Sequence, residues 1–570
     1  MSHAPRSTSE LDFKPAGGVH PSPRDWRDHP IYFLLVDRFD NDDPSVPAYE
    51  AATAPRGRVP QEGRHFQGGN LKGVMRRLDY IRDLGFTAVW ISPVLKNRQE
   101  NCGDYHGYAT QDFLQVDPRF GTLQDLQALV RAAHAKGMYV IMDIVVQHTG
   151  DNWTYEGGWP RQYEGGHQHE FGSWRQIDAT PGLQDDDGVW PVELQDPDSY
   201  KRRGSISNWD DPEQSLHGDF YGLKELKLGN GALGTIIDVY KYWIAAADID
   251  GLRVDTVKHM QDTTVALFCN AVREYARRIG KDNFFIFGEV ATEDDTKLNR
   301  YIGRNTRIDP GNERFPSLDA CLDFPLHSIL DHTIKGLMPP EKLIQRYERV
   351  KEAYTDHGAA SAYFVTFVDN HDQLYRGDKR FLHADEHTRQ AVLAMGYLLT
   401  SRGVPCIYYG TEQAFDGGGS GDEYIRECMF GGKWGAFNTT GMHFFDPNHW
   451  VYRELQAIGQ VRRQEGALRY GRQYFRQISG DGVHFGTPID GRCTLAFSRI
   501  LDTEEVLIAM NLDLADRNDC VNVDCDLTPP GAHMRDLLGG LPDVLVEQSG
   551  GRAFVRVPLG PHRMAILKRK

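Results

Sequence analysis

The stretch LQDLQALVRAAHAKGMYVIMDIVV, residues Leu123–Val146, indicates the architecture of this chain. Its first part, Leu123–Gly137, carries apolar residues at helical spacing and ends at a glycine. Its second part, Met138–Val146, is a nearly continuous apolar run, as is typical of a strand buried on both faces. An amphipathic helix that leads directly into such a strand is the repeating unit of a parallel α/β sheet.

The same unit recurs on both sides of this stretch, from Ile31 to about Tyr409. Strands are also predicted at Ile31–Val36, Phe86–Ser92, Asp250–Asp255, Phe284–Val290, Tyr363–Asn370 and Val404–Gly410. Further helices are predicted at Gly73–Gly85, Thr235–Asp248 and Thr263–Gly280. About eight such units favour a closed (β/α)8 TIM barrel of the α/β class over an open sheet.

Two regions depart from this alternation. Residues 149–232 are polar and rich in Gly, Asp and Trp, and are too long for a loop in a compact domain, so they predict an inserted domain B after the third barrel strand. From about Gly471, short runs such as VHFGTP, CTLAFSRI and EEVLIAMNL alternate with turn signals, which predicts a C-terminal antiparallel β-sandwich. The expected domains are a flexible N-terminal segment (1–24), the barrel (25–148 and 233–470), domain B (149–232) and the sandwich (471–570).

Composition argues against two classes of partner. The 570 residues are 40% hydrophobic and 25% charged, as in a globular protein. The formal net charge of −16 disfavours binding to nucleic acid and to anionic membranes. The polar, Pro-rich N-terminus has no apolar stretch that could act as a signal peptide, and no transmembrane run follows it. We therefore expect a cytoplasmic protein, or a secreted one if a leader has been removed.

The eight cysteines are scattered and form no CxxC pair, so a zinc site is not expected. Cys269 and Cys406 lie in apolar runs and are expected to be buried thiols. Cys520 and Cys525 are close enough in sequence to form a disulfide, and the sequence leaves open whether they do.

Polar residues close four of the predicted barrel strands. They lie in DIVVQH (Asp143–His148), GLRVDTVKH (Gly251–His259), FGEV (Phe287–Val290) and FVDNHD (Phe367–Asp372). Taken alone, each of these charged residues is interpreted as a capping or salt-bridge residue at a strand end. Because a TIM barrel carries its functional groups at the C-terminal ends of the strands, we expect three carboxylates, an arginine and two histidines at one barrel mouth.

The spacing of these groups points to acid–base chemistry. Arg253 and Asp255 are two apart on a strand, so both point into the barrel, and Arg253 can keep Asp255 ionised as a nucleophile. Glu289 follows a buried FFIF run, which raises the pKa of a carboxylic acid and suits a general acid. Asp372 is a third acid that could stabilise a positively charged transition state. Carboxyls about 5 Å apart would give retention, and a wider gap inversion.

In combination, these motifs resemble the α-amylase family, glycoside hydrolase family 13. DxxxxH, GxRxDxxKH, GEV and FxxNHD occur in this order, and GFTAVWISPV, YHGYATQDF, DPRFGT and GVPCIYYGTE match as well. The resemblance covers nearly the whole chain from Ile31. It implies a retaining glycosidase that cleaves α-1,4 bonds of starch or malto-oligosaccharides by double displacement.

The resemblance also implies roles for individual residues. Asp255 would be the nucleophile, Glu289 the general acid/base and Asp372 the transition-state stabiliser, with Asp143 supporting the arginine. The implied sugar-binding side chains are Arg253, His148, His371, Tyr108, His106, Lys258 and His259. His106 stands where exo-acting α-glucosidases tend to carry Asp, which favours an amylase-like enzyme. Lys258 also reads as an ordinary solvated lysine.

Two calcium sites of the family are only partly matched. Where relatives with a calcium site in domain B have Asn and Asp, this chain has Gln147 and, nearest in position, Glu225, each longer by a methylene. A second site in some relatives makes Asn41, Asp43 and Asn70 candidates, although DNDDP also reads as a polar turn. Calcium is thus the one cofactor considered, and no organic cofactor is expected.

Other functions fit parts of the same pattern. A transglycosylase of the 4-α-glucanotransferase type would share the covalent intermediate and differ only in its acceptor. A non-catalytic carbohydrate-binding or interaction domain is disfavoured by the presence of all three carboxylates. A metal-dependent barrel hydrolase would need HxH or DxH at the first strand, which is absent. The aromatic residues Trp434, Phe437 and Phe444 either stack on sugars or pack a loop.

Overall fold

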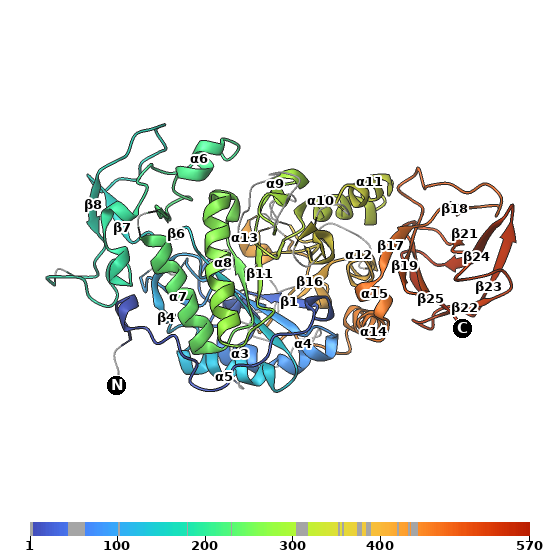
Figure 1. The fold of residues 1–570 in the computed structure, drawn as a ribbon, viewed down its shortest axis with the longest axis horizontal. Helices are drawn as coiled ribbons and strands as arrows, with labels where there is room; N and C mark the ends of the chain where they lie inside the picture. Colours follow the sequence, from blue (N-terminus) through green and yellow to red (C-terminus); the bar gives the residue numbers. More distant parts are fainter. Residues whose placement is uncertain are drawn as a thin grey trace.

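The computed structural model describes residues 4–43, 63–100, 103–178, 180–229, 231–303, 317–350, 354–355, 358–372, 379–382, 389–418, 421–430, 434 and 443–570. A barrel lies in the middle of the molecule (Figure 1). The inserted domain, in teal, lies at one end, and the C-terminal β domain, in red, lies at the other. Within the described residues, no helix has the length and apolar character needed to cross a bilayer.

The barrel sheet is built from eight parallel strands that follow one another around it in chain order. A bridge between Leu322 and Val365 joins the two ends of this sheet. The strands are entirely or almost entirely buried, as the apolar runs predict. They are β1 (Ile31–Leu34), β2 (Ala88–Ile91), β5 (Tyr139–Ile144), β10 (Gly251–Val254), β11 (Phe285–Gly288), β12 (Ala320–Cys321), β15 (Val365–Thr366) and β16 (Val404–Tyr408). The prediction of a TIM barrel is confirmed.

Helices between these strands and after the last of them cover the barrel. The main ones are α3 (Leu71–Arg76), α4 (Leu78–Leu84), α5 (Leu123–His134), α7 (Ala232–Ala247), α8 (Asp262–Arg278), α10 (Phe324–Ile334), α11 (Glu341–Val350), α12 (Arg389–Thr400) and α14 (Trp450–Gln464). Shorter elements are α1 (Val36–Phe39), α9 (Asp295–Asn299), α13 (Asp422–Ile425), α15 (Gly466–Tyr470) and the ribbon β13 (Tyr354–Thr355) with β14 (Gly358–Ala359).

Local signals set the ends of these helices. A capping box between Thr122 and Asp125 starts α5. The predicted Gly73–Gly85 helix is two helices, because Arg77 leaves the helical conformation between α3 and α4. Arg77 reaches instead to the buried Asp40, 2.6 Å from its carboxylate. Helix α4 ends at Gly85 in the left-handed conformation (φ +108°), as the glycine predicts.

The inserted domain follows the third barrel strand, as predicted. Strands β6 (His148–Thr149) and β9 (Lys224–Glu225) pair antiparallel and close the insert at its base. Strands β7 (Trp153–Tyr155) and β8 (Phe171–Trp174) form a ribbon, and helix α6 (Pro212–His217) lies beyond it. The pair β3 (Leu95–Asn97) and β4 (Thr110–Val116) extends from the preceding barrel loop. The buried Trp153 and Tyr200 form the centre of this domain.

The N-terminal residues contact two other parts of the chain. Ser7 and Thr8 donate hydrogen bonds to Glu193 of the inserted domain. The His20 amide donates to Asp248 at the end of α7, 2.9 Å away. These contacts join the N-terminal segment to both the inserted domain and the barrel through two partly buried carboxylates.

The C-terminal domain is antiparallel β, as predicted, and its strands form one continuous nine-stranded order around a separate apolar core. They are β17 (Arg472–Phe475), β18 (Ile478–Ser479), β19 (Thr494–Leu501), β20 (Glu504–Asn511), β21 (Arg517–Val523), β22 (His533–Asp536), β23 (Val544–Ser549), β24 (Arg552–Leu559) and β25 (Met564–Arg569). The VHFGTP run is wrong as a strand: Asp481 accepts three hydrogen bonds there and folds it into turns. Cys520 and Cys525 are free thiols, so the open question of a disulfide resolves against it.

Candidate active site

The predicted residues meet in a cleft of about 1150 Å³ between the barrel mouth and the inserted domain. The strand ends deliver them: Asp255 follows β10, Glu289 follows β11, and Asp372 follows β15. Nine of the ten predicted catalytic and sugar-binding residues line the cleft: His106, Tyr108, His148, Asp255, Lys258, His259, Glu289, His371 and Asp372. The tenth, Arg253, is buried behind the carboxylates.

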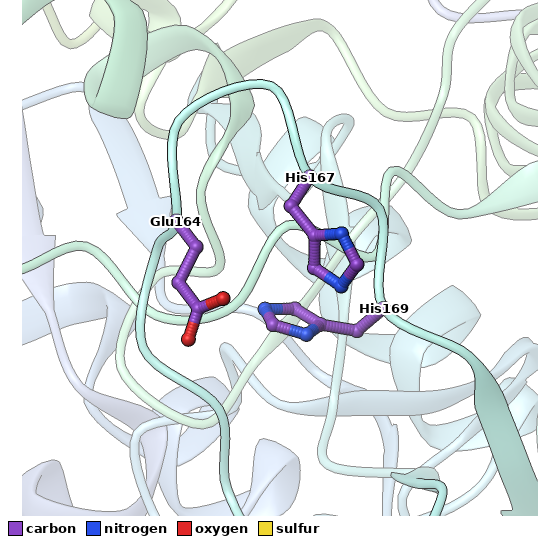
Figure 2. A group of neighbouring side chains, drawn as sticks. All are labelled: Glu164, His167 and His169. Atoms are coloured by element: carbon purple, nitrogen blue, oxygen red, sulfur yellow. The ribbon is translucent and has the colours of Figure 1, made fainter.

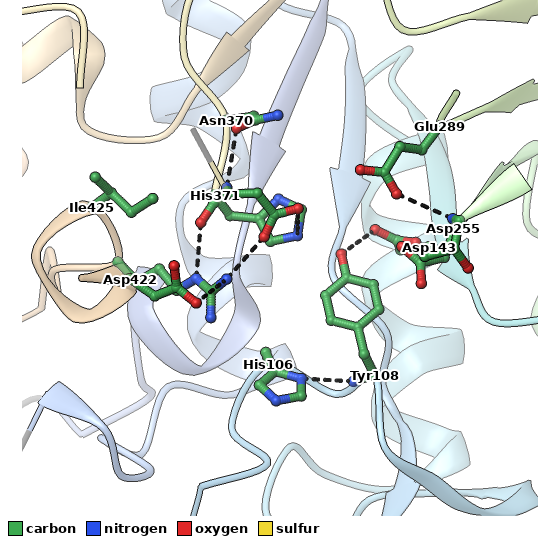
Figure 3. Close-up of polar contacts among 12 residues, drawn as sticks. His106, Tyr108, Asp143, Asp255, Glu289, Asn370, His371, Asp422 and Ile425 are labelled. Atoms are coloured by element: carbon green, nitrogen blue, oxygen red, sulfur yellow. Dashed lines mark hydrogen bonds and ion pairs between the residues drawn. The ribbon is translucent and has the colours of Figure 1, made fainter. Parts of the chain in front are cut away.

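Arg253 binds three carboxylates at once. Its Nη1 lies 2.6 Å from Asp255 and 2.9 Å from Asp143, and its Nη2 lies 3.0 Å from Glu289. Asp143 is fixed in turn by hydrogen bonds from Trp90 (3.0 Å) and the Tyr108 hydroxyl (2.8 Å). The guanidinium of Arg253 therefore holds Asp255 and Glu289, the predicted nucleophile and acid, close to each other. Figure 3 shows Asp143, Asp255 and Glu289 grouped on one side of the site.

A strained residue helps to orient Glu289. Thr256 has φ +47° and ψ +38°, a conformation that is rare for a β-branched residue. This turn aims the Thr256 amide at Glu289 Oε2, 3.1 Å away. The same oxygen contacts Arg253, so the other carboxyl oxygen is left to carry a proton.

The two carboxyls differ in their affinity for a proton. Burial raises the pKa of Asp255, and Arg253 and a hydrogen bond with Glu289 oppose that rise. Burial also raises the pKa of Glu289, Arg253 opposes the rise, and the negative charges of Asp255 and Asp372 add to it. Glu289 therefore keeps its proton to higher pH than Asp255, which is the order that an acid beside a nucleophile requires.

Asp372 has the opposite electrostatic setting. Burial disfavours its ionised form, but His371 and Arg426 outweigh burial and lower its pKa. Arg426 lies 2.9 Å from Asp372 and is the permanent cation of the two, since burial lowers the pKa of His371 to about 3. Figure 3 shows His371 and Asp422 facing Asp255 and Glu289 across the site. Asp372 therefore stays ionised, and its neighbour His371 lies across the site from Asp255 and Glu289 (Figure 3).

Tyr108 forms the floor between the two groups. Its ring is stacked on that of His371, with centroids 5.4 Å apart and planes 12° apart. Its backbone amide donates to His106 Nδ1 over 3.0 Å, so the other ring nitrogen of His106 carries the hydrogen. Both residues line the cleft, where the flat Tyr108 ring can support a sugar.

His148 and His371 each bury an Nδ1 atom that has no hydrogen-bond partner among the residues that the structure describes. Burial lowers the pKa of both imidazoles to about 3, so both are neutral at physiological pH. Both rings line the cleft, where they can contact a bound ligand as neutral groups.

Lys258 and His259 lie on the inserted-domain side of the cleft. His259 is held by the Ser215 carbonyl, 2.8 Å from its Nδ1, and its ring contacts those of Trp209 and Phe220. The neighbouring Tyr221 is 68% exposed and lines the same wall. The inserted domain therefore presents an aromatic surface next to the predicted acceptor-side pair.

Arg426, which lines the cleft, was not predicted from the sequence. Arg426 donates to the His371 carbonyl (2.9 Å) and to the Tyr105 hydroxyl (3.1 Å), besides binding Asp372 and Asp422. It lies in a loop after the last barrel strand, where no strand end marks it. The one available signal was the i,i+4 spacing of Asp422 and Arg426 in DEYIR.

The aromatic segment after β16 packs a loop where the structure describes it. Trp434 is fully buried, and its indole nitrogen donates to the Glu423 carbonyl. Phe444 is buried and stacked on Phe415. The packing interpretation is therefore right for these two side chains and the sugar-stacking one is wrong. Phe437 lies outside the described residues.

The residues at the family's calcium position in domain B do not fit that ion. Lys201 Nζ lies 2.9 Å from Glu225 Oε1 and 2.5 Å from the Leu216 carbonyl, so an ammonium group already supplies the positive charge there. A divalent cation beside that charge would be repelled. Gln147 buries both side-chain amide atoms, and neither has a hydrogen-bond partner in the described part of the chain.

At the second candidate calcium position, the amide groups serve the local fold. Asn70 Oδ1 caps α3 by accepting from the Gly73 amide (2.8 Å), and its Nδ2 donates to Asp42 (2.9 Å). Asn41 Oδ1 accepts from the Asp43 amide over 3.2 Å, which forms the polar turn that DNDDP also indicates. Calcium binding by Asn41, Asp43 and Asn70 stays a prediction.

Comparison with known proteins places this cleft in a known family. The model of the α-amylase catalytic domain matches residues 33–429. The α-amylase of Streptomyces lividans is 32% identical over 485 residues, which cover 76% of this chain and 51% of that protein. The cyclomaltodextrin glucanotransferase of Geobacillus stearothermophilus is 28% identical and is matched over 94% of this chain and 66% of its own length. This chain thus spans only about half the length of the first of these relatives.

Solved structures give the same result for the whole chain. The α-amylase of Geobacillus thermoleovorans, solved with acarbose, has 27% identity and a TM-score of 0.70, with 96% of this chain and 99% of that chain covered. A cyclomaltodextrin glucanotransferase with a three-domain arrangement has 25% identity and a TM-score of 0.69, covering 95% and 99%. The family-model match over residues 33–429 and the carboxylate cleft show that this chain belongs to the α-amylase family.

Proposed function

We propose that the protein is a retaining hydrolase of α-1,4-glucosidic bonds in starch or malto-oligosaccharides. The observation that carries the proposal is the shared guanidinium of Arg253, which holds Asp255 and Glu289 side by side with different proton affinities. Asp255 and Glu289 contact the same guanidinium, at 2.6 Å and 3.0 Å, and this supports the close spacing of retaining enzymes, because inverting enzymes leave room for a water molecule between their carboxyls.

In the first step, Asp255 attacks the anomeric carbon while Glu289 gives its proton to the departing glycosidic oxygen. The sugar–oxygen bond breaks and a glycosyl ester on Asp255 forms. Asp372 stabilises the positive charge that develops on the sugar ring in the transition state. In the second step, Glu289 takes a proton from water, which attacks the anomeric carbon and releases Asp255.

A transglycosylase is the second candidate, and the aromatic wall of the inserted domain favours it. Trp209, Phe220 and the exposed Tyr221 lie beside His259, on the predicted acceptor side. An aromatic surface there holds a sugar acceptor better than water, so the same ester could pass to a second glucan.

A time course with maltoheptaose tests both candidates. Hydrolysis gives only products shorter than the substrate, released first as the α-anomer. Products longer than maltoheptaose, or cyclic ones, would assign transglycosylation with the same catalytic residues. Absence of any cleavage, or release of the β-anomer, would refute the proposal.

A further inference from the structure

Three side chains of metal-ligating type gather in one short loop of the inserted domain. Glu164, His167 and His169 each place one ligand atom so that all three atoms lie within 4.8 Å of one another. Figure 2 shows the carboxylate and the two imidazole rings on the inner side of this loop. None of the three lines the catalytic cleft, so the group is not part of the site described above.

The backbone brings these side chains together. Gly165 adopts φ +52°, and the His167 amide donates to the Glu164 carbonyl over 3.0 Å, which closes a tight turn between them. His167 and His169 are two residues apart just before β8, and their rings meet edge to face at 4.7 Å. The His169 amide donates to the Arg202 carbonyl over 2.8 Å and ties the loop to a neighbouring segment.

Contacts within the protein fix the orientation of the His169 ring without an ion. Its side chain is buried, its Nε2 lies 3.2 Å from the Gln162 carbonyl oxygen, and its ring meets that of Tyr155 edge to face at 5.4 Å. A carbonyl partner of this kind commonly fixes the ring of a metal-binding histidine. Glu164 and His167 are exposed and can close the remaining distance toward an ion, since ligand atoms lie about 2.0–2.2 Å from zinc.

We propose that Glu164, His167 and His169 bind a divalent transition-metal ion of the zinc type, with water as the fourth ligand. Two imidazoles and one carboxylate match zinc, whereas calcium requires six to eight oxygen ligands. Arg203 donates to the Gly165 carbonyl over 3.3 Å, and this nearby positive charge moderates the affinity. The bound ion links Glu164 to His167 and His169 across the turn at Gly165 and so stabilises this loop of the inserted domain. The absence of a CxxC pair predicts no zinc site built from cysteines, but it carries no information about a site built from histidines and a carboxylate.

The test is a titration of metal-stripped, untagged protein with ZnCl₂, followed by calorimetry. Cobalt(II) absorption serves as a second readout, because tetrahedral coordination gives visible bands. The variants are Glu164→Gln, His167→Ala and the double variant, all at exposed positions. The matched control is His484→Ala, which removes an exposed histidine that lies 2.7 Å from a carboxylate in the C-terminal domain.

We expect one equivalent of zinc to bind the wild-type protein and the control. Each single variant should weaken binding by at least about 10-fold, and the double variant should lose the equivalent and the cobalt bands. Glycosidase activity without added metal should be unchanged in all of them. The absence of stoichiometric binding in the wild type, or its persistence in the double variant, would overturn the proposal without bearing on the catalytic assignment.

Discussion

Replacement of Glu289 by Gln removes the proposed general acid and leaves the proposed nucleophile, Asp255, in place. Both contacts that Glu289 makes to Arg253 and to the Thr256 amide use the single oxygen Oε2. The glutamine side-chain oxygen can accept both, so we expect the variant to fold normally. What it loses is the proton that the second oxygen carries. General acid catalysis contributes about 10²- to 10⁴-fold, so we expect kcat/KM for maltoheptaose to fall by about 10³-fold, or about 4 kcal/mol.

The decisive assay uses a leaving group that needs no proton. With α-maltosyl fluoride, Glu289→Gln should release a burst of fluoride equal to the enzyme present, because Asp255 still attacks. Turnover should then be slow, because no base activates water, and the maltosyl ester should appear on Asp255 by mass spectrometry. Asp255→Asn is the control and should give no burst. Equal losses on fluoride and maltoheptaose, without a burst, would refute the assigned roles.

Three further predictions concern charge. Because burial raises the pKa of Glu289, kcat/KM should stay high through neutral pH and fall as the pH rises through that raised pKa; an alkaline limb near the ordinary pKa of a glutamic acid would contradict this. Arg426→Met removes a charged partner of Asp372 and should lower kcat/KM by about 10- to 100-fold, with partial recovery in Arg426→Lys; unchanged kinetics would show that Arg426 is dispensable. Any rise of Tm with CaCl₂ should vanish in Asp43→Ala and persist in Glu225→Gln, because a lysine already supplies the cation beside Glu225; the reverse pattern would place calcium at Glu225.

The barrel and its reactive groups could be predicted because both depend on local sequence. Apolar runs specify the buried strands, and Arg253, Asp255 and Glu289 lie within or directly after such runs. A residue near a strand end can be placed at the barrel mouth without knowledge of any other contact. The strand β12 is only two residues long, Ala320–Cys321, and carries too little pattern to be recognised by itself.

Features that depend on distant contacts could not be predicted in this way. Arg426 lies 54 positions from Asp372, and only the folded chain brings them together. The aromatic wall of Trp209 and Phe220 comes from an insert with little periodic pattern. Trp434 illustrates the same limit, since its sequence context suits either a ligand platform or a packed loop, and its burial decides the matter.

The coupling of Glu289 to its neighbour has a consequence for the timing of proton transfer. The negative charge of Asp255 is one of the causes that raise the pKa of Glu289. In the proposed mechanism, that charge disappears once Asp255 becomes an ester, while the guanidinium of Arg253 remains. The Glu289 carboxylate, which by then has given its proton to the leaving oxygen, has a lower pKa beside the ester and therefore stays ionised while it activates water. The reaction itself would reset the proton affinity of Glu289 between its two halves, with no movement of the chain.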